Sequence, residues 1–246
     1  PKRILSLNLG LPKHQKINRT RKNVSVAVRL SNLEVGFQGH TLLSIEDFHV
    51  KPGEVLAITG PSGIGKTSLL KTIAGLLTPI SGTVHVCGAT IPQRPERGSI
   101  GYIPQKLGLV RHSSVWANVM LGSRAGNPRS TSREHAIDAI EAMGLGEKKN
   151  EPIKRLSGGQ QRRVATARTL AQRPRLILAD EFLSELDEET SERVVKSVLK
   201  YVRSSEAAMI LVEHDVSRAR EISDRLLVID DGRLNPFITD TSIMEV

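Results

Sequence analysis

Aromatic side chains and cysteine are both scarce in this sequence of 246 residues. Phe, Trp and Tyr together make up 3% of the chain, which argues against RNA-binding modules that stack bases on an aromatic platform. Cys87 is the only cysteine, so neither an internal disulfide nor a multi-cysteine metal site can form. What remains is an ordinary globular composition that fits a reducing compartment.

Long apolar runs are also missing. The strongly apolar stretches, such as residues 207–212, fall far short of the roughly 20 residues that a membrane-spanning helix needs. No basic segment followed by a long apolar stretch opens the sequence, so we expect no secretory signal. The sequence predicts a soluble protein, or at most a peripheral membrane protein.

Acidic side chains are absent from the first 30 residues, which hold eight basic ones: Lys2, Arg3, Lys13, Lys16, Arg19, Arg21, Lys22 and Arg29. Residues 31–246 are nearly neutral, with 27 basic against 26 acidic residues. We interpret residues 1–23 as a basic extension that is either a solvated tail or a contact for anionic lipid or a partner's acidic surface. A nucleic-acid arm is the weaker alternative, because the rest of the chain offers no basic groove.

The clearest motif occupies residues 60–67. Gly60, Pro61, Ser62, Gly63, Ile64, Gly65, Lys66 and Thr67 match the phosphate-binding pattern G-x-x-x-x-G-K-[ST] at every fixed position. The glycines let main-chain N–H groups approach phosphate oxygens, and the start of the next helix adds its positive end. Lys66 is expected to reach the β- and γ-phosphates, and Thr67 to bind Mg²⁺. A buried strand before the motif and a helix after it supply the context that it requires.

The periodicity of apolar residues predicts an α/β fold: a P-loop NTPase core with a mainly parallel sheet, an N-terminal antiparallel β subdomain and an inserted α-helical subdomain. Strands are expected at residues 24–30, a pattern that 33–37 extends, and at 42–50, 54–59, 83–87, 100–103, 175–179 and 207–212. Helices are expected at 66–77 and 188–202. Between about 106 and 165 the pattern changes, with helices expected at 115–121 and 135–143 around a polar stretch. We interpret this region as the inserted helical subdomain.

Two carboxylates close a strand at residues 176–181, Leu-Ile-Leu-Ala-Asp-Glu. Asp180 is placed to hold the Mg²⁺ shell. Glu181 should point the other way because side chains alternate along a strand, and there it can act as the base toward an attacking water.

Residues 156–160 read Leu-Ser-Gly-Gly-Gln and precede a helix expected to run to about residue 171. Ser157 can cap this helix. Because a helix N-terminus with flexible glycines is itself an anion site, capping and phosphate binding are compatible.

Six motifs in this order resemble the nucleotide-binding subunits of ABC (ATP-binding cassette) transporters. Besides residues 60–67, 156–160 and 176–181, they are a glutamine after a strand (102–105), a Ser-Glu-Leu-Asp turn (184–187) and a histidine in Val-Glu-His-Asp (212–215). The resemblance covers residues 24–236, which we take as the ATPase domain. Residues 237–246 are then a C-terminal tail.

The resemblance implies a head-to-tail dimer, a homodimer or a heterodimer, with two ATP molecules at the interface. Ser157, Gly158, Gly159 and Gln160 of one subunit would then close over the γ-phosphate that Lys66 of the other holds. It further implies that Gln105 lies near Mg²⁺ and the water, that His214 contacts the γ-phosphate, that Asp187 belongs to the nucleotide site, and that Phe37 stacks on adenine. Phe37 as a strand-end core residue is the alternative.

Two residues depart from the family pattern. Phe182 stands where proline is usual, and Glu185 where a small residue is common. Both flank the expected base, so they bear on the turnover rate and the interface more than on ATP binding.

The function implied is an ATPase that powers a membrane transporter from the cytoplasmic face of the membrane, through separate transmembrane permease subunits and without nucleic acid. A soluble cassette protein that acts on nucleic acid or the ribosome is the alternative, and a non-transport membrane regulator is a third. Residues 100–118 look like those of small-molecule importers, the phosphonate type among them, whereas the Leu-Ala-Asp-Glu strand end also occurs in export cassettes. The cargo stays open.

Overall fold

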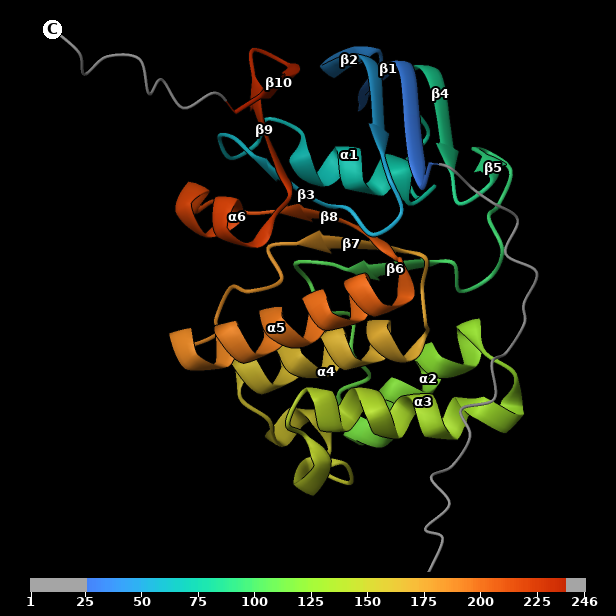
Figure 1. Ribbon diagram of the computed structural model, residues 1–246, viewed down its shortest axis with the longest axis vertical. Helices are drawn as coiled ribbons and strands as arrows, with labels where there is room; N and C mark the ends of the chain where they lie inside the picture. The colour runs from blue at the N-terminus through green and yellow to red at the C-terminus, as the bar shows by residue number, and fades with distance from the viewer. Residues whose placement is uncertain (1–25, 238–246) are drawn as a thin grey trace, which may run out of the picture.

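The computed structural model describes residues 26–237. The predictions for residues 1–23 lie outside the described residues. Of the predicted tail at residues 237–246, only Phe237 is described. The strands form one ten-stranded sheet, and helices lie on both sides of it (Figure 1). The strands are β1 Val28–Phe37, β2 His40–Val50, β3 Val55–Thr59, β4 Ser81–Val86, β5 Ala89–Thr90, β6 Ile100–Ile103, β7 Leu176–Asp180, β8 Ala208–Val212, β9 Arg225–Asp230 and β10 Arg233–Pro236. The helices are α1 Lys66–Ile73, α2 Val115–Gly126, α3 Arg129–Ala142, η1 Gly146–Lys148, η2 Ile153–Arg155, α4 Gly158–Ala171, α5 Glu188–Ser205 and α6 Val216–Ile222.

The sheet has two parts, as the sequence predicts. Its order is β5-β4-β1-β2-β10-β9-β3-β8-β7-β6. Strands β9, β3, β8, β7 and β6 pair in parallel, whereas β5, β4, β1 and β2 pair antiparallel. The carboxyl ends of the parallel strands lead into the loops that carry the motifs, which is where ligands bind in open α/β sheets.

The three central strands separate two hydrophobic cores. In β7, Ile177 and Ala179 face one core, and Leu176 and Leu178 face the other. Strands β3 and β8 divide their side chains in the same way, because successive side chains point to opposite faces of a strand. A strand buried on both faces reads as a continuous apolar run, which explains why these segments show no polar alternation.

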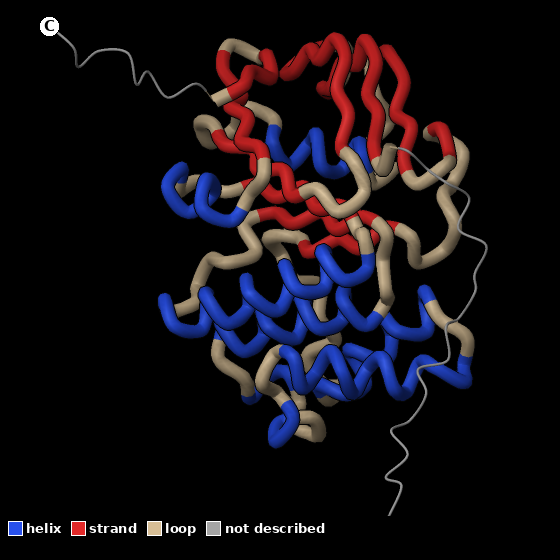
Figure 2. Tube along the Cα trace, in the orientation of Figure 1, coloured by secondary structure: helices blue, strands red, loops and turns tan. Residues whose placement is uncertain are grey.

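Helix α1 lies in one core and helices α2 to α5 in the other. Leu69, Leu70 and Ile73 of α1 pack between the antiparallel strands and the parallel ones. Figure 2 shows the longer helices gathered on the opposite side of the sheet. Among residues 26–237, no helix combines the length and hydropathy needed to cross a membrane.

Several boundaries differ from the sequence prediction. Helix α1 ends at Ile73, four residues earlier than expected, because Gly75 adopts a left-handed φ of 71° and its N–H turns back to the Thr72 carbonyl. The polar stretch around residues 122–132 is largely helical. Gly122 and Gly126 allow this: a Cβ on Gly122 would lie 2.1 Å from the Arg168 carbonyl oxygen of α4, so only glycine lets the two helices approach. Strands β5, β9 and β10 and helix α6 were not predicted.

Candidate functional site

The phosphate loop joins β3 to α1 with main-chain angles that favour glycine. Gly63 has a φ of 81° and Gly65, the residue before α1, a φ of 112°. No side chain caps the start of α1. The first-turn N–H groups of a helix have no partner within the helix, so an uncapped start that follows glycines suits an anionic ligand. The loop predicted from the sequence is therefore present in its expected context.

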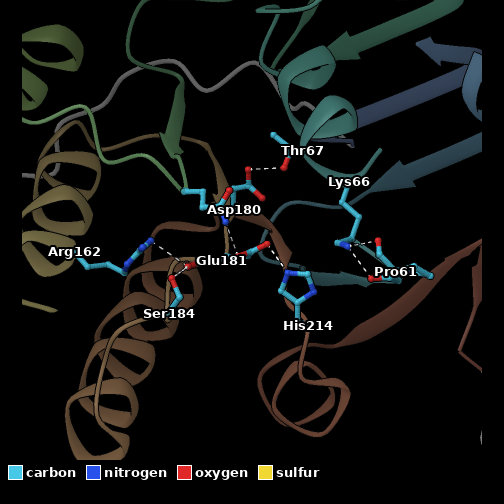
Figure 3. A network of polar contacts seen from close by, with 10 residues as sticks. Pro61, Lys66, Thr67, Arg162, Asp180, Glu181, Ser184 and His214 are labelled. Atoms are coloured by element: carbon cyan, nitrogen blue, oxygen red, sulfur yellow. Dashed lines mark hydrogen bonds and ion pairs between the residues drawn. The ribbon is translucent and has the colours of Figure 1, made fainter. Parts of the chain in front are cut away.

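Lys66 is buried at the start of α1. Its Nζ donates to the carbonyl oxygens of Gly60 and Pro61, both at 2.7 Å (Figure 3). Burial lowers the pKa of the Lys66 ammonium, while the nearby carboxylates of Glu181 and Asp180 oppose that shift. The ammonium thus lies inside the loop, with two carboxylates of the site close enough to act on it.

Asp180 ends β7 and is 1% exposed. Its Oδ2 accepts a hydrogen bond from Thr67 Oγ1 at 2.9 Å, which joins the acidic strand to the phosphate loop. Its Oδ1 is buried and makes no hydrogen bond of standard geometry with the described residues. The Tyr102 hydroxyl lies nearby, and burial together with the Asp180 carboxylate raises the pKa of Tyr102 to about 12. Burial raises the pKa of this carboxyl, the hydrogen bond from Thr67 opposes the shift, and a buried acceptor without a donor is costly.

Glu181 lies at the centre of a polar network. Gln105 Nε2 donates to Glu181 Oε2 at 3.0 Å, and His214 Nε2 lies 2.6 Å from Glu181 Oε1. Three segments distant in sequence, the ends of β6, β7 and β8, supply these side chains. Figure 3 shows His214 directed at Glu181. The prediction that alternation along the strand orients Glu181 is wrong, however. Glu181 lies beyond the strand with a left-handed φ of 52°, so strand alternation does not set its direction.

The helix after Leu-Ser-Gly-Gly-Gln begins with a capping box. Gln160 N donates to Ser157 Oγ at 3.3 Å, and Ser157 N donates to Gln160 Oε1 at 3.1 Å. The predicted cap at Ser157 is confirmed, and Gln160 completes it. Helix α4 begins at Gly158, directly after Ser157, and packs in the core opposite to that of α1. Helices α1 and α4 therefore lie on opposite sides of the sheet (Figure 1).

Three further residues have clear local roles. Phe37 is 50% exposed at the end of β1, so it is not the core residue of the alternative interpretation. Asp187 caps α5 by accepting from Thr190 N at 2.9 Å, and this hydrogen bond lowers the pKa of Asp187. Phe182 is buried among apolar side chains between the sheet and α5. Phe182, which stands where the family usually has proline, thus adds an aromatic ring to the core, and this ring takes no part in the polar network.

Three polar groups lie around Glu181 to which the sequence assigned no role there, although two of them belong to the motifs at residues 184–187 and 212–215. Arg162 and Ser184 both donate to the Glu181 carbonyl oxygen, at 3.1 and 2.9 Å. Glu213, next to His214, is buried, and burial raises its pKa to about 7. Only the tertiary structure brings Arg162 to this place, and the sequence motif included Glu213 only as the neighbour of His214.

The residues present fit a magnesium nucleotide. The uncapped helix start and the glycines suit phosphates, and Lys66 adds a positive charge. The unpartnered Asp180 Oδ1 beside the Thr67 hydroxyl offers the small set of oxygen ligands that Mg²⁺ uses together with phosphates and water.

Comparison with known proteins gives the same result. The family model described as ABC transporter matches residues 43–184. The L-cystine transport system ATP-binding protein TcyN of Escherichia coli (strain K12) is 38% identical over 221 residues, which cover 85% of this chain and 88% of the relative. A putative 2-aminoethylphosphonate import ATP-binding protein of Salmonella typhi is 34% identical over 83% of this chain, which spans 56% of that relative.

A solved structure shows the same fold with nucleotide. It is a dimeric ATP-binding cassette in a post-hydrolysis state bound to ADP and Pi, with a TM-score of 0.75, 29% identity, and coverage of 84% of this chain and 96% of that one. Fold, site and relatives therefore agree: this chain belongs to the ABC transporter family, as an ATP-binding and ATP-hydrolysing subunit.

Proposed function

We propose that this chain powers a membrane importer as one half of a head-to-tail dimer that encloses two ATP molecules. In each composite site, the phosphate loop comes from one subunit, and Ser157, Gly158 and Gly159 come from the other. The observation that carries the proposal is the separation of α1 and α4 onto opposite sides of the sheet. Because α4 lies on the opposite side of the sheet from α1, its glycine-containing N-terminus is suited to another subunit's nucleotide rather than to its own. The dimeric state of the related cassette supports this arrangement.

In the proposed site, residues of one subunit bind and orient the triphosphate. Main-chain N–H groups of residues 60–67 and the Lys66 ammonium hold the β- and γ-phosphates, and the exposed Phe37 ring stacks on adenine. Thr67, Asp180 and Gln105 would hold Mg²⁺, which neutralises charge on the phosphate oxygens when bound. Gln160 and Asp187 support the interface from the first turns of α4 and α5.

Glu181 is the proposed base. As the water oxygen bonds to the γ-phosphorus and the bond to the β-phosphate oxygen breaks, the Glu181 carboxylate accepts the proton that the water loses. Gln105 and His214 each hold one carboxylate oxygen, so the orientation of the base is fixed before water attacks. His214 is half exposed and also contacts the γ-phosphate in this proposal.

The transport role rests on the relatives, which are named as the ATP-binding protein of an L-cystine transport system and as import ATP-binding proteins for 2-aminoethylphosphonate (putative), methionine and spermidine/putrescine. We infer that transmembrane permease subunits hold the chain at the cytoplasmic face of the membrane and choose the cargo. No nucleic-acid role is proposed, because the body of the chain is nearly neutral.

Co-purification from detergent-solubilised membranes tests the transport role. We expect a polytopic membrane protein to accompany the cassette. After reconstitution, one of the solutes imported by its relatives should stimulate the ATPase activity of the complex, and the same complex with Glu181→Gln should show no stimulation. Co-purified rRNA or DNA without a membrane protein would instead favour the soluble alternative.

A further inference from the structure

Arg162 is a buried arginine on the first turns of α4. Its side chain is 3% exposed, and it is directed at the loop that follows β7 (Figure 3). Nη1 donates to the Glu181 carbonyl oxygen at 3.1 Å, and Nη2 lies 3.7 Å from Glu185 Oε1. A buried guanidinium is costly unless it is paired. Both Nη atoms of Arg162 contact the loop at residues 181–185, whereas its Nε has no hydrogen-bond partner among residues 26–237.

The main chain of Glu181 needs such support because it is left-handed, a conformation that non-glycine residues rarely adopt. The Glu181 carbonyl oxygen accepts from Ser184 N at 3.2 Å and Ser184 Oγ at 2.9 Å as well as from Arg162. Gln105 and His214 hold the carboxylate at the other end of the residue. Among these contacts, Arg162 alone comes from α4.

Glu185 brings the same loop against the start of α4. It also has a left-handed φ, 65°, and a Cβ built on Gly158 would lie 2.6 Å from Glu185 Oε2. The missing side chain at Gly158 therefore makes room for the Glu185 carboxylate. This carboxylate in turn faces Arg162, so the unusual Glu185 and the buried arginine form one cluster.

We propose that Arg162 is a positioning residue for ATP hydrolysis, which holds the main chain of Glu181 from the helix that begins at Ser157. Glu185 fixes the guanidinium in that place. The proposal rests on the role of Glu181 as the base proposed above. It links the segment that meets the partner's ATP to the base that acts on the subunit's own ATP.

Arg162→Met tests this, because methionine fills similar space without donating a hydrogen bond, and Ser184 still serves the Glu181 carbonyl. In the full chain we expect a kcat roughly 10- to 100-fold lower, since a small displacement of a catalytic group is costly. The Kd for ATP should stay unchanged. Arg162→Lys should recover part of the kcat, because one ammonium can reach the carbonyl oxygen. Arg173→Met is the control: Arg173 lies beyond the other end of α4 and pairs with Asp138, so kcat should not change.

Glu185→Gln is the second variant, and it keeps the proposal testable if Arg162→Met does not fold. Alone it should lower kcat at an unchanged melting temperature. Added to Arg162→Met it should have no further effect, as expected for two residues acting through one contact. A wild-type kcat for both variants, while Glu181→Gln is inactive, would overturn the role of Arg162 and leave the base in place. An active Glu181→Gln would instead contradict the proposed function.

Discussion

Glu181→Gln is expected to lower ATP turnover by about 10² to 10⁴-fold, the usual contribution of a general base. The amide keeps the shape of the side chain and can still accept hydrogen bonds from Gln105, but it cannot take a proton from water. Because Lys66, Thr67 and the loop glycines are untouched, ATP affinity should remain. ATP that binds without being hydrolysed should hold the dimer together.

Gel filtration with ATP and Mg²⁺, together with phosphate release, measures both effects. The variant should elute as a dimer in ATP and as a monomer without it. Glu192→Gln, an exposed glutamate on α5, is the matched control and should behave like the unmodified chain. Persistent hydrolysis by a protein that stays monomeric would show that Glu181 is not the base.

Lys66→Ala should act one step earlier, on nucleotide binding. Hydrogen bonds to charged groups contribute about 1.5 to 3 kcal/mol, so we expect a roughly 10- to 100-fold weaker Kd for ATP. Turnover should fall with it, because the γ-phosphate loses the cation that orients it. Titration with a fluorescent ATP analogue measures the affinity directly.

Lys71→Ala is the control for this variant, since Lys71 lies on the same helix but is exposed. It should bind the analogue as the unmodified chain does. Normal affinity in Lys66→Ala would mean that the ammonium does not contact the phosphates.

Segments with strong local patterns were predictable from the sequence. The loop at residues 60–67, the strand that ends at Asp180 and the cap at Ser157 each depend on neighbours within a few residues, and each is confirmed in its structural context. The roles of these residues toward the nucleotide stay predictions. Their order along the chain carried the resemblance to the family.

Features that depend on tertiary contacts were not predictable. Gly122 looks like a loop residue, yet it lies in a helix because α4 packs against it. The left-handed Glu181 and its bond to Arg162, 19 residues away in the chain, have no local sequence pattern. Strand β10 was missed because Leu234 is the only large apolar side chain among its four residues. Strand β9 was missed although residues 226–229 form an apolar run, and its pairing with β3 is long-range.

A mixing experiment tests the composite site most directly. Ser157→Arg removes the part of the site that a subunit offers to its partner, and Lys66→Ala removes the part that it holds itself. The dimer of either variant alone therefore has no complete site. A mixed dimer regains one, formed by Lys66 of the first variant and Ser157 of the second. The ATPase activity of the mixture should therefore rise above that of both parents and peak at equal amounts. Activity that stays at the level of the parents at every ratio would contradict the head-to-tail dimer.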